Sequence, residues 1–271
     1  MTTTWRLIAL LAGFGLVLGA CTDSSPAAST DRSSGNSVVR IAAASDLQFA
    51  LEEIVALVAD RYPNLEVTTT YGSSGTFLQQ IVNGAPFDLY LSADLEYPRD
   101  LVDRGLADER DLFPYAIGRL VEWVPDAEGP GPTGDLSTLA DPAISTVAIA
   151  NPEHAPYGVA AVEAMKHFDV YGEVQPKLVL GENVAQAAEF VLSGNADAGV
   201  VALSLVLAPG VADEGTWARV PLDSFDRIDQ GGVVLADASD PDAARDVRDV
   251  ILSAEGREIL QRYGFSMPKG D

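Results

Sequence analysis

Short apolar runs with the composition of β-strands alternate with amphipathic helical segments along most of this chain, and this alternation limits the folds open to it. The expected strands are 38–43, 65–70, 88–91, 119–124, 146–150, 177–180, 198–202 and 232–235. The expected helices are 47–58, 77–81, 95–104, 158–168, 184–193 and 243–263. Strands separated by helices predict an α/β fold, with parallel sheets and helices on both faces. In such sheets a ligand binds beyond the carboxyl ends of the strands.

Two of the expected strands end in small residues and then open directly into a helix. Residues 41–46 read Ile-Ala-Ala-Ala-Ser-Asp and residues 71–76 read Tyr-Gly-Ser-Ser-Gly-Thr, so Ser45 and Ser74 stand at helix starts. The first four N–H groups of a helix lack intrahelical partners, and the helix dipole adds about half a positive charge there. Two such N-termini facing one cleft predict an oxyanion site. An ordinary N-cap role for each serine remains the alternative, and residues 45–48 fit a capping box.

The N-terminal residues predict export and a lipid anchor. Residues 7–20 form an apolar run, shorter than the about 18 residues of a membrane-spanning helix, so 1–20 is interpreted as a signal peptide. Leu18-Gly19-Ala20-Cys21 resembles the lipobox of bacterial lipoproteins, which makes Cys21 the expected lipidation site. A free Cys21 after an ordinary cleaved signal is the alternative. Residues 21–37 lack large apolar side chains and predict a flexible tether, so the protein is expected outside the cytoplasm, anchored to the cell membrane.

Charge and residue types exclude several classes of partner and site. The formal net charge is −23 and no run is rich in lysine or arginine, which argues against nucleic acid and against an anionic lipid surface. An anion site must therefore use local dipoles and hydroxyl groups. His154 and His167 lack metal-ligand spacing, and neither forms a catalytic motif with a serine. Cys21 is the only cysteine, so no internal disulfide can form.

Five short motifs, in order along the chain, resemble the molybdate-binding proteins of ABC importers. They are Ala-Ala-Ala-Ser at 42–45, Gly-Ser-Ser at 72–74, the run 83–94, the run 151–158 and Arg-Tyr-Gly-Phe at 262–265. The resemblance covers about residues 38–268. It implies the two-lobed periplasmic-binding-protein fold, with two mainly parallel sheets flanked by helices and a ligand cleft between the lobes. Lobe 1 would comprise 38–117 and 228–271, and lobe 2 would comprise 118–227.

The same resemblance implies a function. The protein would be a solute receptor that captures molybdate, or tungstate, and delivers it to the permease of an ABC importer. It would act as a monomer, without a cofactor, without nucleic acid and without enzymatic activity. The metal would contact the protein only as an oxyanion, through its oxygen atoms.

The family pattern places the anion among five residues of this chain. These are Ser45, Asp46, Ser74, Tyr157 and Val184. Both serines are expected to donate their hydroxyl and backbone N–H groups. Tyr157 and Val184 are expected to donate backbone N–H groups. Asp46 follows a serine where leucine is common in the family, so its N–H is expected to donate while its carboxylate points away from the anion.

A second departure from the family leaves the role of one side chain open. Many members have a tyrosine where this chain has Ala202, which removes one hydroxyl donor. Either the Tyr157 hydroxyl replaces that donor, or only the Tyr157 backbone N–H contacts the anion.

The ligand chemistry explains why such a cage would suit molybdate. A fully deprotonated tetrahedral dianion only accepts hydrogen bonds, so it needs donors on every side. A carboxylate in contact with the ligand would instead select a protonated species such as hydrogen phosphate. The alternatives are a receptor for another oxyanion such as sulfate, a hydrolase on a similar α/β scaffold, and a scaffold protein that has lost its ligand.

Overall fold

The structure is a computed structural model that describes residues 37–125 and 129–268. The expected signal peptide, Cys21 and nearly all of the expected tether lie outside the described residues. No helix of the described part is long and apolar enough to cross a membrane.

The first sheet has five strands in the order β2-β1-β3-β10-β4. Their bounds are β1 Ser37–Ala44, β2 Leu65–Gly72, β3 Leu89–Ser92, β4 Ala107–Ile117 and β10 Asp229–Leu235. β1 runs parallel to β2 and β3, whereas β10 is antiparallel to β3 and β4. The apolar run of β1 is buried on both faces, while the edge strand β2 alternates half-buried and exposed residues, as expected of a strand with one solvated face.

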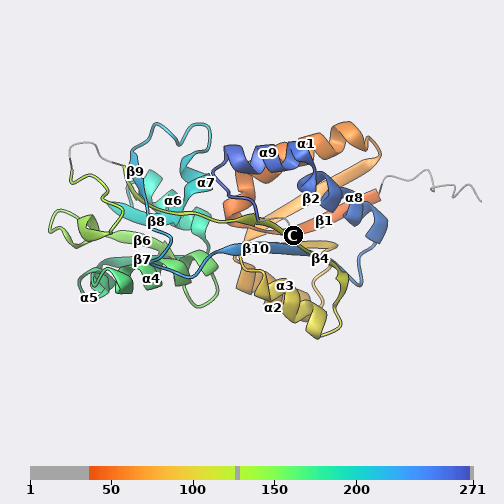
Figure 1. Ribbon diagram of the computed structural model, residues 1–271, viewed down its shortest axis with the longest axis horizontal. Coiled ribbons are helices and arrows are strands. Elements are labelled where there is room, and N and C mark those ends of the chain that lie inside the picture. Colours follow the sequence, from red (N-terminus) through yellow and green to blue (C-terminus); the bar gives the residue numbers. More distant parts are fainter. Residues whose placement is uncertain (1–36, 126–128, 269–271) are drawn as a thin grey trace, which may run out of the picture. The chain divides into compact units, whose positions relative to one another are not determined.

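Helices cover both faces of this sheet (Figure 1). They are α1 Gln48–Arg61, α2 Ser74–Val82, α3 Glu96–Asp103, α8 Pro241–Leu252 and α9 Ala254–Arg262. One apolar core joins the sheet to α1, α8 and α9, and a second core joins it to α2 and α3. The short 3-10 helix η1, Ser45–Leu47, connects β1 to α1.

The second sheet also has five strands, in the order β7-β6-β8-β5-β9. Their bounds are β5 Leu120–Val124, β6 Val147–Ala150, β7 Leu178–Gly181, β8 Ala198–Ala202 and β9 Thr216–Arg219. β6 is parallel to β7 and β8, and β5 is antiparallel to β8 and β9. The helical segments of this part are α4 Pro156–His167, α5 Tyr171–Val174, α6 Val184–Leu192, α7 Leu203–Val206, η2 Ser137–Ala140 and η3 Gln175–Lys177.

The chain crosses between the sheets twice, from β4 to β5 and from β9 back to β10 (Figure 1). The strands next to these crossings run antiparallel to their neighbours, whereas the other strands pair in parallel, so each sheet is mixed. The expected α/β architecture of two helix-flanked sheets is confirmed. The exact lobe boundaries stay a prediction.

Some expected elements differ from the structure. The strands β4 and β9 were not expected, because β4 carries charged residues between its apolar ones and β9 is a short edge strand. The single helix expected at 243–263 is two helices. Ser253 leaves the helical conformation, and its hydroxyl oxygen accepts the N–H of Gly256 at 3.1 Å, which begins α9.

Candidate functional site

All five residues predicted to hold an anion line one small pocket. Ser45 and Asp46 lie in η1, Ser74 begins α2, Tyr157 is the second residue of α4, and Val184 begins α6. The N-terminal ends of these four helices therefore converge, two from the first sheet and two from the second. The pocket volume is about 10 Å³, roughly the space needed by one water. A tetrahedral oxyanion is larger than one water, so the walls of the pocket must separate slightly to admit it.

Two serines line this pocket, and the hydroxyl oxygen of each accepts a backbone N–H group. The Ser45 Oγ accepts the backbone N–H of Ala185 at 3.2 Å, and the Ser74 Oγ accepts that of Ala93 at 2.9 Å. A hydroxyl oxygen that accepts an N–H retains its own hydrogen for a further acceptor. Each serine therefore has a donor that these contacts do not use.

The capping interpretation of these serines is wrong. Neither η1 nor α1 has a side-chain cap, so the expected capping box at 45–48 does not form. Ser74 is the first residue inside α2, whereas the N-cap position belongs to Ser73. The hydroxyls contact N–H groups of other elements, because the strand ends bring these elements within reach.

Backbone N–H groups at three helix N-termini add further donors. The N–H groups of Ser74, Tyr157 and Val184 stand in first turns, where no intrahelical acceptor exists. None of the loop and cap hydrogen bonds between backbone groups of residues 37–125 and 129–268 uses them. At α6 the side chain of Asn183 caps the N–H groups of Ala185 and Gln186, both at 3.1 Å, and leaves the N–H of Val184 for the pocket.

The Asp46 carboxyl is buried beside these donors, with only 1% of the residue exposed. Its Oδ2 accepts the Tyr157 hydroxyl at 3.0 Å and the Gln230 Nε2 at 2.5 Å, while Oδ1 has no hydrogen-bond partner. Burial raises the pKa of Asp46 to about 6, against the lowering effect of hydrogen bonds from Gln230, from Tyr157 and from the backbone N–H groups of Asp46 and Leu47. The carboxylate is thus held by groups on α4 and β10.

The Tyr157 hydroxyl is occupied by this contact. It donates to Asp46 and also lies 3.3 Å from the Gln230 Nε2. Burial and the neighbouring Asp46 raise the Tyr157 pKa well above its usual value, so the hydroxyl keeps its proton. Ala202 ends β8 with a fully buried side chain that offers no donor.

Sequence reasoning missed two residues that hold Asp46. Gln230 is a fully buried amide near the start of β10, between Asp229 and Gly231, and this local sequence does not distinguish it from an exposed amide. Ser204 donates its hydroxyl to the Asp46 carbonyl at 2.7 Å. Nothing in the sequence around Ser204 distinguishes it from other serines.

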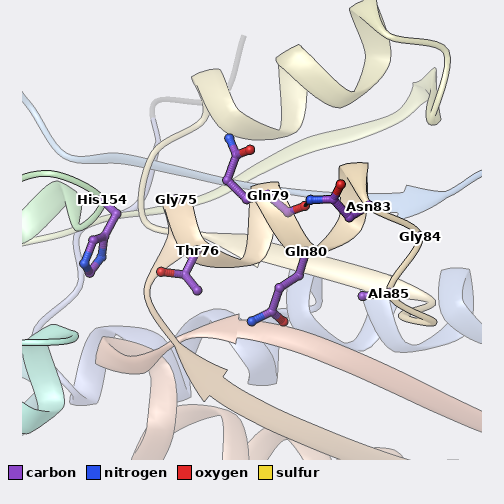
Figure 2. A pocket seen from close by; sticks show the side chains of 8 residues that line it. All are labelled: Gly75, Thr76, Gln79, Gln80, Asn83, Gly84, Ala85 and His154. Atoms are coloured by element: carbon purple, nitrogen blue, oxygen red, sulfur yellow. Dashed lines mark hydrogen bonds between the residues drawn. The ribbon is translucent and has the colours of Figure 1, made fainter.

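A second set of contacts joins α2 to the loop before α4. The carbonyl oxygen of His154 accepts the Ser73 hydroxyl at 2.5 Å and the Gly75 N–H at 2.9 Å. Figure 2 shows His154 near the N-terminal end of α2, beside a groove of about 710 Å³ that contains the amide side chains of Gln79, Gln80 and Asn83. These contacts tie the first half of the pocket to the second.

The Ser73–His154 pair is not arranged as a nucleophile and its base. The Ser73 Oγ lies 2.9 Å from the His154 Nδ1. Because Ser73 gives its hydrogen to a carbonyl, which can only accept, the Nδ1 must be the donor toward Ser73. An imidazole nitrogen that carries a hydrogen cannot remove the serine proton.

Comparison with known proteins assigns the chain to a family. The family model described as bacterial extracellular solute-binding protein matches residues 39–266. The chain belongs to this family. The molybdate-binding protein ModA of Rhodobacter capsulatus is 38% identical over 224 residues, which is 83% of this chain and 86% of the relative. The putative ABC transporter substrate-binding lipoprotein YvgL of Bacillus subtilis is 30% identical over 96% of both chains.

A solved structure agrees with this assignment. The periplasmic molybdate-binding protein of Azotobacter vinelandii superposes with a TM-score of 0.78 at 28% identity, covering 85% of this chain and 100% of that one. The two-lobed binding-protein fold expected from the sequence is therefore confirmed. Membership in a family of extracellular binding proteins also places the chain among binding proteins rather than enzymes.

Proposed function

We propose that this protein captures molybdate, and also tungstate, outside the cytoplasm and delivers it to the permease of an ABC importer. One observation carries the proposal: four helix N-termini and two serine hydroxyls with unused hydrogens meet at one pocket. The names of the relatives from Rhodobacter capsulatus and Azotobacter vinelandii support molybdate as the ligand.

The proposed donors are the hydroxyls of Ser45 and Ser74 and the backbone N–H groups of Ser74, Tyr157, Val184 and Asp46. Hydrogen bonds to a charged group contribute about 1.5–3 kcal/mol each. About five of them, less the cost of desolvation and immobilisation, are enough for the roughly 8 kcal/mol of a micromolar complex. The ligand is bound without a cofactor and without chemical conversion.

We further propose that the protein acts as a monomer of two lobes, 38–117 with 228–271 and 118–227, tethered through a lipid on Cys21. The composition of the two sheets supports the lobes, because strands of the first sheet lie in 37–117 and 229–235 and those of the second lie in 120–219. The lipoprotein name of the Bacillus subtilis relative supports the anchor.

Calorimetric titration of the purified protein with molybdate, tungstate, sulfate and phosphate tests the proposal. We expect molybdate and tungstate to bind at least about ten times more tightly than sulfate, because both are larger tetrahedra. Molybdate at about 100 times its Kd should add roughly 2.7 kcal/mol to the free energy of unfolding. Equal affinities for sulfate and molybdate would exclude selection by size. No heat with any oxyanion, or turnover of generic ester or phosphoester substrates, would contradict the receptor function.

A further inference from the structure

The buried carboxyl of Asp46 is the one group at the pocket whose charge opposes an anion. Asp46 lines the pocket together with Ser45, Ser74, Tyr157 and Val184. The hydrogen bonds that it receives from other side chains, Tyr157 and Gln230, both reach the same oxygen, Oδ2. Oδ1 is buried and has no hydrogen-bond partner. The backbone N–H groups of Asp46 and Leu47 lower the pKa of the carboxyl, but burial raises it by more, so the buried charge is only partly stabilised.

The surroundings of Asp46 offer no compensating positive charge. The titratable groups that act on it are Tyr157 from α4 and Tyr115 from β4, and burial keeps both phenols protonated. Gln230 from β10 is neutral, and Ser204 from α7 contacts only the Asp46 backbone carbonyl. Tyr115 donates its hydroxyl to the carbonyl of Ser92 at 2.9 Å rather than to the carboxyl group. Among the described residues, no lysine, arginine or histidine contributes to the pKa of this group.

A dianion in the pocket would therefore meet an ionised carboxylate in a poorly hydrated environment. Like charges that share a desolvated site raise the proton affinity of the acid, as in paired carboxylates. Resting on the proposed oxyanion-binding function, we infer that capture of a dianion is coupled to the uptake of one proton by Asp46. The proton comes from solvent and forms an O–H bond on Oδ1, since Oδ2 already accepts two hydrogen bonds. No other bond forms or breaks.

The coupling makes Asp46 a determinant of ligand charge. With Asp46 ionised, a monoanion of the same tetrahedral shape is repelled less than a dianion. With Asp46 protonated, no negative charge opposes the ligand, and the hydrogen-bond donors of the pocket favour the dianion over the monoanion. The pKa of about 6 in the unliganded protein means that the group is mostly ionised at neutral pH and gains its proton on binding.

Titration calorimetry of the wild-type protein with molybdate measures the coupling directly. Titrations near pH 7 in two buffers of different ionisation enthalpy give the number of protons taken up, and we expect a value approaching one per anion. The affinity for molybdate should fall by up to about tenfold per unit as the pH rises above about 6. The affinity for perrhenate, a tetrahedral monoanion, should change much less over the same range.

Asp46→Asn is the decisive variant, because asparagine keeps the shape and cannot titrate. It should bind molybdate at least as tightly as the wild type at neutral pH, without proton uptake and without the pH dependence. Glu122→Gln is the matched control. Glu122 is a fully buried carboxyl with an unpartnered oxygen and a raised pKa, but it contacts Thr133 and Gly134 away from the pocket. This control should keep the wild-type proton uptake.

Three results would overturn the inference while leaving the receptor function intact. They are molybdate binding with no proton uptake, equal pH profiles for wild type and Asp46→Asn, and proton uptake that disappears in Glu122→Gln. Tighter binding of hydrogen phosphate than of molybdate would also overturn it, because the carboxylate would then accept a proton that the ligand brings. Absence of binding to any of these anions at any pH would contradict the receptor function itself.

Discussion

At the scale of single residues, the partners of a side chain decide its role at the pocket. Ser45 and Ser74 stand at helix starts, yet their hydroxyls accept N–H groups from other elements instead of capping their own helices. Asp46 sits among donors, but Tyr157 and Gln230 hold one of its oxygens. The contacts therefore support the proposed anion-binding role of the two serines and leave Asp46 with a carboxyl held by its neighbours. Substitution of each residue can test its role.

Removing either serine hydroxyl should weaken binding more than folding. Ser45→Ala and Ser74→Ala each delete one donor to the proposed dianion, a loss of about 1.5–3 kcal/mol, or roughly 10- to 150-fold in affinity. Calorimetry with molybdate measures the affinity, and thermal melting of the same proteins measures the stability. Ser224→Ala is the control, since Ser224 is a buried serine whose hydroxyl donates to the Pro221 carbonyl. Unchanged affinity in both pocket variants would show that the anion binds elsewhere.

The stability of the unliganded protein should depend on pH through Asp46. Its pKa is raised from 3.8 to about 6 on folding, so the folded protein binds this proton more tightly than the unfolded chain. Stability is therefore highest below about pH 4 and declines as the pH rises through about 6, by roughly 3 kcal/mol for this group. Denaturant unfolding of wild type and Asp46→Asn across this range should show that the variant loses the decline.

Asp111→Asn provides a control of opposite sign. Hydrogen bonds from Arg245 hold the pKa of Asp111 below its usual value, so its contribution is present above that value and is lost as the pH falls. A wild-type stability that rises between about pH 4 and about pH 7, relative to Asp46→Asn, would contradict the assignment for Asp46.

At the scale of elements, the site consists of helix N-termini rather than of cationic side chains. α2, α4 and α6 each direct their first turns at the pocket, and η1 supplies the fourth wall. Close approach of backbones makes this arrangement possible. A Cβ atom on Gly75 would lie 2.6 Å from the His154 carbonyl oxygen, the same oxygen that accepts the Gly75 N–H.

Gly75→Ala should hold α2 away from the loop before α4 and so weaken binding. Alanine favours a helix over glycine by about 0.5–1 kcal/mol, but the added methyl group overlaps a backbone atom, a strain of about 1–3 kcal/mol. We expect roughly five- to 150-fold weaker molybdate binding by calorimetry. Gly172→Ala is the control, because Gly172 lies in α5 with no atom within 4 Å of the added methyl group. Equal affinities for the two variants would show that this contact does not contribute to the site.

At the scale of the whole molecule, the pocket exists only because two separately built sheets share it. The chain crosses between them at Gly118, where a Cβ atom would lie 2.4 Å from the Tyr157 hydroxyl. Asp46 and Gln230 belong to the first sheet and its connections, whereas Tyr157 belongs to the second. Motion of one sheet against the other would open or close all of these contacts together.

The proposed lipid anchor lies in residues outside the described part. Cys21→Ser should release the protein from membranes or leave it unprocessed, because a lipobox-like sequence without its cysteine cannot be acylated. Fractionation and metabolic labelling with a fatty acid measure this, and the molybdate affinity of the purified variant should match that of the wild type. Absence of label on the wild-type protein would contradict the lipid anchor.

Local sequence patterns were enough to predict most of the elements and the positions of the candidate donors. Strand and helix patterns depend on neighbours within a few residues, so most of the βα order and the serines that follow β1 and β2 could be predicted. The family motifs added the set of five pocket residues, whose roles as ligands stay a prediction.

What these groups contact depends on the packing of segments that lie far apart in the sequence. Asp46 meets Tyr157 and Gln230 across separations of 111 and 184 residues, which no local pattern records. The partners of the serine hydroxyls and the antiparallel entry of β4 and β9 depend likewise on how the chain crosses between the sheets. The charge that Asp46 carries follows from its burial and its hydrogen bonds, and both arise from packing over the whole chain.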